Sequence, residues 1–384
     1  MNALSYADQT FFIIKSGFAV EAVLSKKLSD GRIECLACAR RCKLREGQTG
    51  FCGVRTVRDG VLRLDVYGLI SAIAVDPIEK KPLTHFYPGA LVLSFSTFGC
   101  NWACQYCQNY ELSQRRRAEG FEVTPELLVK IAESYGAHGI TYTYNEPSIF
   151  IEFAHDVGIL ARSKGLFNTF VTNGYMTPEA VKYASEFLDA ATVDFKGNAD
   201  EKFLRRYVYI TDAEPIFETL AEMKKYGIWV EITDLVVPEV GDDLEKARKL
   251  VRRIIDILGP EVPIHFLRFH PDYNMRHLFP TPIETLEKHV EVAKEEGAKY
   301  AYVGNVPGHR YEHTYCPECG RVVIKRRGFD ILEINLIEKG GEYRCKFCGA
   351  KINIKGRIMP TWREEFRFVY VPIHAFAKWV KRES

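Results

Sequence analysis

The stretch Cys100-Asn101-Trp102-Ala103-Cys104-Gln105-Tyr106-Cys107 follows closely on the apolar run 91–96. Its cysteines have the spacing C-x3-C-x2-C, so one short loop carries three thiolates. These can bind three corners of a four-iron cluster, whereas a cluster bound by protein alone normally takes four cysteines. The missing fourth ligand leaves one iron open to an outside molecule. We therefore predict a catalytic iron–sulfur site on Cys100, Cys104 and Cys107.

The remaining cysteines indicate that this triad shares no ligand with another site. Eight of the 11 cysteines fall into two complete sets of four: Cys35, Cys38, Cys42 and Cys52, and Cys316, Cys319, Cys345 and Cys348. Stray structural thiols, or a zinc site that shares ligands, fit this inventory less well. So many cysteines in a chain without an export signal point to metal binding in a reducing cytoplasm, where disulfides are rare.

The composition is that of a soluble globular protein with one large core and small modules. The chain has 384 residues, of which 47% are hydrophobic and 27% charged, and its net charge is +2. Such a small charge gives no global field for nucleic acid. No apolar run approaches the roughly 20 residues that span a bilayer, so we expect no membrane segment. The run 11–14 lacks the regions of a signal peptide and is expected to be a helix, a strand or an extension.

Strand-like and helix-like segments alternate through the centre of the chain. The expected strands are 91–96, 139–144, 166–172, 191–195, 228–237, 263–269 and 299–303. The expected helices are 125–135, 148–163, 178–188, 215–226, 244–258 and 283–296. Thr124 and Thr177 are predicted N-caps, and Ser148 or Asn145 should lie at the start of the second helix. Six or seven repeats predict an α/β fold with an open, partial (βα)6-type barrel, with a doubly wound sheet as the alternative.

The predicted strands end in polar residues. Chemistry in a parallel barrel collects at the C-terminal ends of its strands. The ends with polar or charged side chains are 98–100, 144–147, 172–174, 194–196, 268–271 and 304–305. We interpret them as one shared site that begins with the cysteine loop.

These motifs resemble the radical S-adenosylmethionine (SAM) superfamily, and the barrel is similar to that of pyruvate formate-lyase activating enzymes. Four strings resemble the radical SAM member of the AmmeMemoRadiSam system. They are Asp-Pro-Ile-Glu-Lys-Lys-Pro-Leu at 76–83, Phe-Gly-Cys-Asn-Trp at 98–102, Cys-Gln-Asn at 107–109 and Val-Gly-Asn-Val-Pro-Gly-His at 303–309. The resemblance covers roughly residues 21 to 315.

The resemblance implies a role for each matching position. The three cysteines would ligate a 4Fe-4S cluster, and Tyr106 would lie near the adenine of SAM. Glu146 would bind the SAM amino group, although Tyr144 and Asn145 stand where the family has two glycines. The other implied SAM contacts are Asn145, Thr172, Asn173, Asp194, Lys196 and His270.

Simpler interpretations of these positions remain open. Asp194 and Lys196 can pair with each other, and His270 can be a structural histidine. Asn173 precedes a glycine and is a common turn residue. Asn305 and His309 can face the substrate, or the segment around them can be only a turn that leaves the barrel.

The two sets of four cysteines predict two further metal sites. Cys316, Cys319, Cys345 and Cys348 form two C-x2-C knuckles, typical of a closed tetrahedral zinc ribbon with a structural role. For Cys35, Cys38, Cys42 and Cys52 we favour zinc. A second iron–sulfur cluster, able to pass electrons to the first, is the alternative. We divide the chain into 1–88 with this site, 89–308 as the barrel, and 309–384 as the ribbon and tail.

The resemblance implies an enzyme that takes one electron from an external reductant, splits SAM and removes a hydrogen atom from a substrate through a 5'-deoxyadenosyl radical. The expected cofactors are a 4Fe-4S cluster, SAM and zinc. The substrate remains open: a glycine of a partner protein, or a small molecule or protein handled with Memo-like and AmmeCR-like partners. RNA is a third option, because residues 311–384 carry 15 Lys and Arg against 9 Asp and Glu. A non-catalytic zinc-ribbon binding protein is the alternative from another class.

Overall fold

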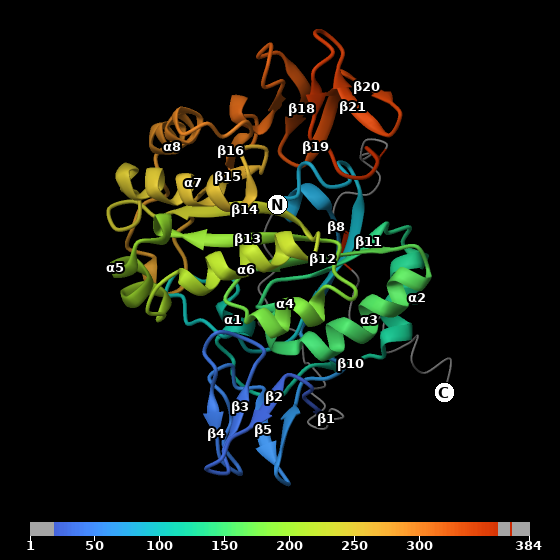
Figure 1. The fold of residues 1–384 in the computed structure, drawn as a ribbon, viewed down its shortest axis with the longest axis vertical. Coiled ribbons are helices and arrows are strands. Elements are labelled where there is room, and N and C mark those ends of the chain that lie inside the picture. Colours follow the sequence, from blue (N-terminus) through green and yellow to red (C-terminus); the bar gives the residue numbers. More distant parts are fainter. Residues whose placement is uncertain (1–18, 360–368, 371–384) are drawn as a thin grey trace.

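The computed structural model, which describes residues 19–359 and 369–370, is built around one nine-stranded sheet (Figure 1). Its strand order is β16-β15-β14-β13-β12-β11-β9-β8-β23. The strands are β8 (Ala72–Pro77), β9 (Leu91–Ser96), β11 (Gly139–Tyr142), β12 (Phe167–Thr172), β13 (Ala190–Lys196), β14 (Trp229–Val236), β15 (Ile264–Arg268), β16 (Ala301–Gly304) and β23 (Val369–Tyr370). Neighbours from β9 to β16 pair in parallel, whereas β8 and β23 are antiparallel at one edge.

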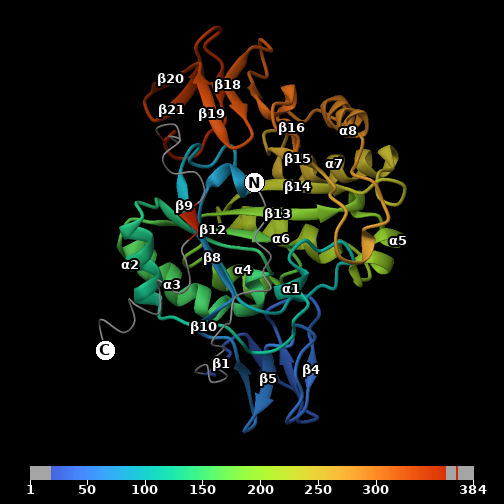
Figure 2. The ribbon, with the colours of Figure 1, turned by 180° about the vertical axis from the view of Figure 1, so that it is seen from behind.

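The seven parallel strands follow one another in chain order without a reversal, which excludes a doubly wound sheet and confirms the open partial barrel. Six helices connect them and cover the outer face of the sheet (Figures 1 and 2). They are α2 (Pro125–Ser134), α3 (Ile151–Ser163), α4 (Pro178–Ala184), α6 (Glu214–Lys225), α7 (Leu244–Leu258) and α8 (Ile283–Glu295). Two short helices, α1 (Tyr110–Ser113) and α5 (Glu201–Phe203), lie between strands.

Side-chain caps fix where these helices begin. Thr124 Oγ1 accepts a hydrogen bond from Leu127 N (3.3 Å) and Thr177 Oγ1 from Ala180 N (3.0 Å), which confirms both predicted N-caps. A 3-10 turn over Pro147–Phe150, capped by Glu146, leads directly into α3 at Ile151. The second helical segment therefore begins about where it is predicted, with Ser148 near its start.

Small antiparallel sheets flank the barrel at opposite ends (Figures 1 and 2). The N-terminal ones contain β1 (Val20–Glu21), β2 (Ser25–Lys27), β3 (Ile33–Cys35), β4 (Lys43–Leu44), β5 (Arg55–Arg58) and β6 (Val61–Leu64). The C-terminal ones contain β17 (Thr314–Tyr315), β18 (Val322–Arg327), β19 (Asp330–Ile334), β20 (Leu336–Lys339), β21 (Glu342–Cys345) and β22 (Lys351–Ile352). A two-stranded pair, β7 (Leu69–Ile70) and β10 (Phe121–Glu122), lies beside the barrel.

Each flanking part is tied to the barrel by a buried arginine. Arg55 of β5 donates from Nε to Ile149 O (2.8 Å) and forms a buried ion pair with Glu152 of α3. Arg326 of β18 donates from Nη2 to Thr84 O (2.9 Å). The run 11–14 lies outside the described residues, and among those described no helix combines the length and apolar character that a membrane crossing requires.

One carboxylate closes the inside of the barrel near the N-terminal ends of its strands. Glu231 of β14 is fully buried, and its Oε2 lies 3.1 Å from His265 Nε2. It accepts six hydrogen bonds of 2.8–3.3 Å, from Thr84 N, Thr84 Oγ1, His85 N, Phe86 N, Trp229 Nε1 and His265 Nε2. Burial disfavours its charge, but these donors and the neighbouring histidines lower the pKa of Glu231 to about 2.

We predict that Glu231→Gln lowers the free energy of unfolding by about 3–5 kcal/mol, because it replaces an acceptor oxygen by an NH2 group that faces donors. Urea titration under anaerobic conditions measures this change. The exposed Glu133 supplies the matched control, Glu133→Gln, which should leave stability within about 0.5 kcal/mol of the wild type. A loss below about 1 kcal/mol for Glu231→Gln would show that the carboxylate does not hold the barrel closed.

Candidate active site

A cavity of about 710 Å³ occupies the inside of the open barrel. At one end it is lined by Cys100, Cys104 and Cys107, which are half-buried on the loop after β9. At the other end it is lined by the segment after β8 and by residues of the C-terminal part, including Arg326. Residues from the ends of the parallel strands lie between the two ends. The structure therefore brings the predicted strand-end residues to one place.

The cysteine loop is held by backbone contacts. Gly99 turns the chain at the end of β9 with φ of +91°, a conformation that favours glycine. Ala103 N donates to Val208 O (3.2 Å) and Gln105 N to Tyr207 O (2.9 Å), so the segment after α5 supports the loop. Cys107 Sγ lies 3.1 Å from Ser113 Oγ. Three thiols are thus fixed on one wall of the cavity.

Glu146 joins three elements at the mouth of the barrel. Its Oε1 accepts from Ser148 N (3.0 Å) and Thr172 Oγ1 (2.8 Å), and its Oε2 accepts from Asn173 N (2.8 Å). Burial raises the pKa of Glu146, and these donors oppose that effect. Thr172 supports Glu146 and is not part of the cavity lining, whereas Asn173 is. The carboxylate therefore has a structural role that the resemblance did not indicate.

Tyr144 and Asn145 stand where the resembling family has two glycines. Tyr144 has a φ of +67°, the left-handed conformation that glycine adopts readily, and its OH donates to Asp76 Oδ2 (2.9 Å). Asn145 donates to Thr97 Oγ1 (3.0 Å) and Gly99 O (3.0 Å), and its buried Oδ1 has no partner among the described residues. Tyr144 thus adopts a backbone conformation that favours glycine, while Asn145 is fixed by its side-chain bonds.

Unpartnered polar atoms at this end fit a bound cofactor. Asn145 Oδ1 and Trp102 Nε1 are buried, belong to residues that line the cavity, and have no hydrogen-bond partner in the described part of the chain. Buried polar groups normally find partners, so such atoms indicate a ligand. Both atoms are thus available to a polar ligand in the cavity that the three thiols also line.

Asp194 and Lys196 lie at the end of β13 and line the cavity. Lys196 Nζ donates to Asp194 Oδ2 (3.0 Å), so the simpler interpretation, that they pair with each other, describes this structure. Thr233 Oγ1 also donates to Asp194. Burial lowers the pKa of Lys196, but Asp194 outweighs it and the net shift is upward. The ammonium group therefore stays charged inside the cavity.

The other predicted contacts divide between the cavity and its surroundings. Tyr106 is buried, lines the cavity and stacks on Phe203 with ring centroids 5.8 Å apart. His270 is exposed at the cavity mouth, and Asn305 also lines it. His309 is not part of the lining, and its Nε2 lies 3.1 Å from Glu287 Oε1 of α8.

The far end of the cavity carries a charged cluster to which the sequence assigned no role. Asp76 at the end of β8 accepts from Lys80 Nζ (2.8 Å) and Lys81 Nζ (2.7 Å) as well as from Tyr144. Burial opposes its charge, but the two ammonium groups lower the pKa of Asp76 to about 2. Burial lowers the pKa of Lys81 to about 8 despite Asp76.

Two further buried groups line this end. Glu79 Oε1 accepts from Gly89 N (2.8 Å), whereas Glu79 Oε2 has no partner within the described residues. Arg326 donates through both Nη atoms, and its buried Nε likewise has no partner there. Burial raises the pKa of Glu79 to about 7. An acceptor and a donor thus remain available for a ligand.

The raised pKa of Glu79 predicts a pH effect on stability. Its pKa rises from 4.5 to about 7 on folding, so its contribution is fully present below about pH 4.5 and is lost as the pH rises through about 7. Relative to Glu79→Gln, the wild type should lose on the order of 3 kcal/mol of unfolding free energy between about pH 5 and 8. Anaerobic urea titrations at several pH values measure the difference, and two parallel curves would contradict the assignment.

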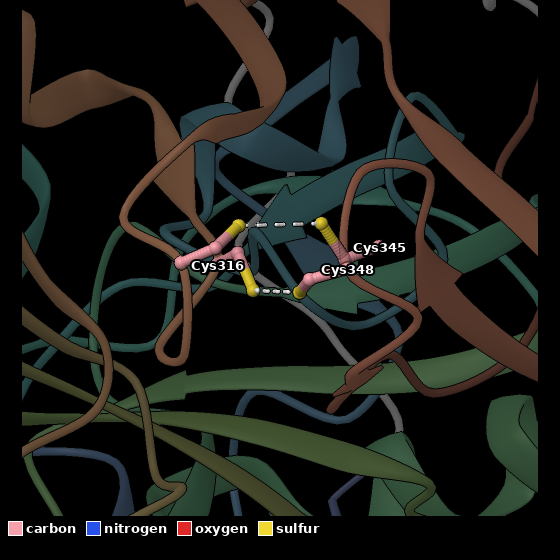
Figure 3. A group of neighbouring side chains, drawn as sticks. Cys316, Cys345 and Cys348 are labelled. Atoms are coloured by element: carbon pink, nitrogen blue, oxygen red, sulfur yellow. Dashed lines mark hydrogen bonds between the residues drawn. The ribbon is translucent and has the colours of Figure 1, made fainter.

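The C-terminal thiols form a compact set (Figure 3). The sulfurs of Cys316 and Cys348 lie 3.6 Å apart, and those of Cys319 and Cys345 lie 3.7 Å apart. All four lie within 4.8 Å of one another. Zinc–sulfur bonds of about 2.3 Å in a tetrahedron place sulfurs roughly 3.8 Å apart, so this set has the dimensions of a single zinc site.

Comparisons with known proteins agree with the site. The family model of the radical SAM superfamily matches residues 94–251. An uncharacterized protein of Methanocaldococcus jannaschii is 46% identical over 336 residues, 87% of this chain and 99% of that protein. The pyruvate formate-lyase-activating enzyme of Clostridium pasteurianum is 25% identical over 216 residues, 51% of this chain and 87% of the enzyme.

Among solved structures, SuiB of Streptococcus suis bound to S-adenosylmethionine matches with a TM-score of 0.45 at 11% identity, over 59% of this chain and 53% of that one. A match of this degree assigns no role to any residue here. The family model and the two sequence relatives are the comparisons that decide the classification. This chain belongs to the radical SAM superfamily and is an enzyme that uses SAM.

Proposed function

We propose that this enzyme splits SAM reductively and uses the resulting radical to remove a hydrogen atom from a small molecule with an anionic group. One observation carries the proposal: the three thiols on the loop after β9 face the same cavity as the strand-end polar groups and the charged cluster around Asp76. Cofactor and substrate then share one enclosed space, which a short-lived radical requires.

Cys100, Cys104 and Cys107 are the residues that would hold the 4Fe-4S cluster, with its fourth iron left to SAM. When bound there, the cluster supplies the electron that cleaves SAM into methionine and a 5'-deoxyadenosyl radical, which takes hydrogen from the substrate. The fixed loop and the unpartnered Asn145 Oδ1 favour this placement.

The chain's own residues bind and orient SAM. Lys196 Nζ can turn from Asp194 toward the carboxylate of SAM, while Thr233 continues to hold Asp194. Asp194 is then available to the SAM ammonium group. Glu146 keeps the ends of β11 and β12 together, and its Oε2, which accepts only one bond from the described residues, can accept another. Buried Tyr106 excludes water beside the thiols.

The charges at the far end favour an anionic substrate. Lys80, Lys81 and Arg326 line that end beside the acidic Asp76, Glu79 and Glu312, and Glu79 is partly protonated near neutral pH because burial raises its pKa to about 7. The three basic side chains can therefore offer donors to an anionic group there. Arg326 Nε and Glu79 Oε2, two buried atoms at this end without a partner among the described residues, suit a carboxylate or phosphate and a neighbouring hydroxyl or amine.

A second candidate is the activation of a glycyl-radical enzyme, in which the substrate is a glycine of a partner protein. The 25% identity with the Clostridium pasteurianum activating enzyme favours it. The two candidates differ in what must reach the cavity: a free small molecule, or a loop of another protein.

We predict that Cys104→Ala reduces the formation of 5'-deoxyadenosine to background, because two thiolates no longer hold the cluster firmly. Anaerobic protein is mixed with SAM and dithionite, and the nucleoside is quantified by chromatography. Zinc content should stay the same, which shows that the variant is folded. Wild-type protein with intact iron and sulfide that forms no 5'-deoxyadenosine would contradict the proposed reaction.

We predict that Lys81→Met removes the response to substrate but leaves slow, uncoupled SAM cleavage. The low-mass fraction of a cell extract should raise 5'-deoxyadenosine formation by the wild type. The increase with Lys81→Met should be at least about tenfold smaller, because a hydrogen bond from a charged group is lost. Lys164→Met, at an exposed position, is the matched control. Stimulation by the protein fraction alone would instead support glycyl-radical activation.

A further inference from the structure

Four thiols of the N-terminal part surround a second, small cavity. Cys35, Cys38, Cys42 and Cys52 all line it, and three of them are buried while Cys42 is half-buried. We propose that these thiols bind a second iron–sulfur cluster of the four-iron type, and not zinc.

The ribbon of this chain shows how closely thiols are spaced at a predicted zinc site. Over residues 19–359 and 369–370, the ribbon thiols are the one set of three or more Cys, His, Asp or Glu whose ligand atoms all lie within 4.8 Å of one another. The N-terminal thiols form no such set, although they face one cavity. The four sulfurs around a tetrahedral zinc ion lie roughly 3.8 Å from one another. Thiols that stand farther apart cannot all bind the same ion.

The catalytic triad shows how thiols are spaced at a predicted cluster site. Cys100, Cys104 and Cys107 also face one cavity and also do not form a set within 4.8 Å. A four-iron cluster carries one thiolate on each iron corner, and its ligands stand farther apart than those of one ion. The N-terminal thiols therefore share the open spacing of the triad and not the compact spacing of the ribbon.

The cavity between the N-terminal thiols measures about 10 Å³, room for about one water-sized sphere. The four thiols therefore have to move outward as a cluster is built between them. Arg40 and Arg55 also line the cavity; Arg55 is paired with Glu152, so Arg40 is the cation of the lining that can offset thiolate charge.

The proposed cluster lies directly against the loop of the triad. A Cβ on Gly99 would come within 2.5 Å of Cys52 O. The segment that carries Cys52 therefore touches the triad loop at Gly99, the residue before Cys100. Arg40 donates from Nε to Asn101 O, and Asn101 lines the cavity of the N-terminal thiols. Two reduced clusters in this position interact magnetically, which provides a signature that zinc cannot give.

Metal analysis of the full chain, purified anaerobically without added iron, tests the proposal. We expect about eight irons, eight sulfides and one zinc per chain. About four irons with two zincs would overturn it. Either result is independent of SAM cleavage, which requires only the triad, so this test and the test of the proposed function can fail separately.

The variant Cys100→Ala/Cys104→Ala/Cys107→Ala isolates the second site. It should keep about four irons and show a narrow electron paramagnetic resonance signal after reduction, whereas the reduced wild type should show a broadened one. Cys35→Ala/Cys52→Ala is the reciprocal variant and should lose about four irons but keep its zinc. A triad variant that contains two zincs and no iron would overturn the proposal, and if the variants do not fold, the wild-type count decides.

Discussion

The carboxylate of Glu231 is the interaction on which the architecture depends. An open barrel of seven parallel strands leaves its interior exposed where the strands begin, and something must close it. Here the segment Thr84 to Phe86 does so, held by four of the six hydrogen bonds that one buried carboxylate accepts. Arg326 then joins the ribbon to the same segment. A buried charge satisfied only by donors is costly to disturb, which makes the closure stable.

This closure also shapes the cavity. Because the chain after β8 must reach Glu231, it carries Asp76, Glu79 and Lys81 along the inner wall, opposite the cysteine loop. One end of the cavity is thus equipped with thiols and the other with charges. Tyr144 joins the two ends: its left-handed backbone lies beside the site of the cysteines, and its OH reaches Asp76.

The sequence predicted features that depend on local spacing. Hydrophobic periodicity indicated the parallel strands and crossover helices. Thr124 and Thr177 were recognisable as caps because each accepts a hydrogen bond from the backbone N–H only three residues later. Glu231 could not be predicted, since its partners Thr84 and His85 lie 147 and 146 residues away and no local pattern marks it within its strand. Glu146 was noticed for its motif, but its bond to Thr172 required the fold.

The central claim is that one iron at the triad is open to SAM. Electron–nuclear double resonance of the reduced protein, with SAM labelled by 15N in its amino group and 17O in its carboxylate, tests it most directly. The account predicts hyperfine coupling of both labels to the cluster held by Cys100, Cys104 and Cys107. An intact, reduced cluster that shows no coupling to either label would contradict it.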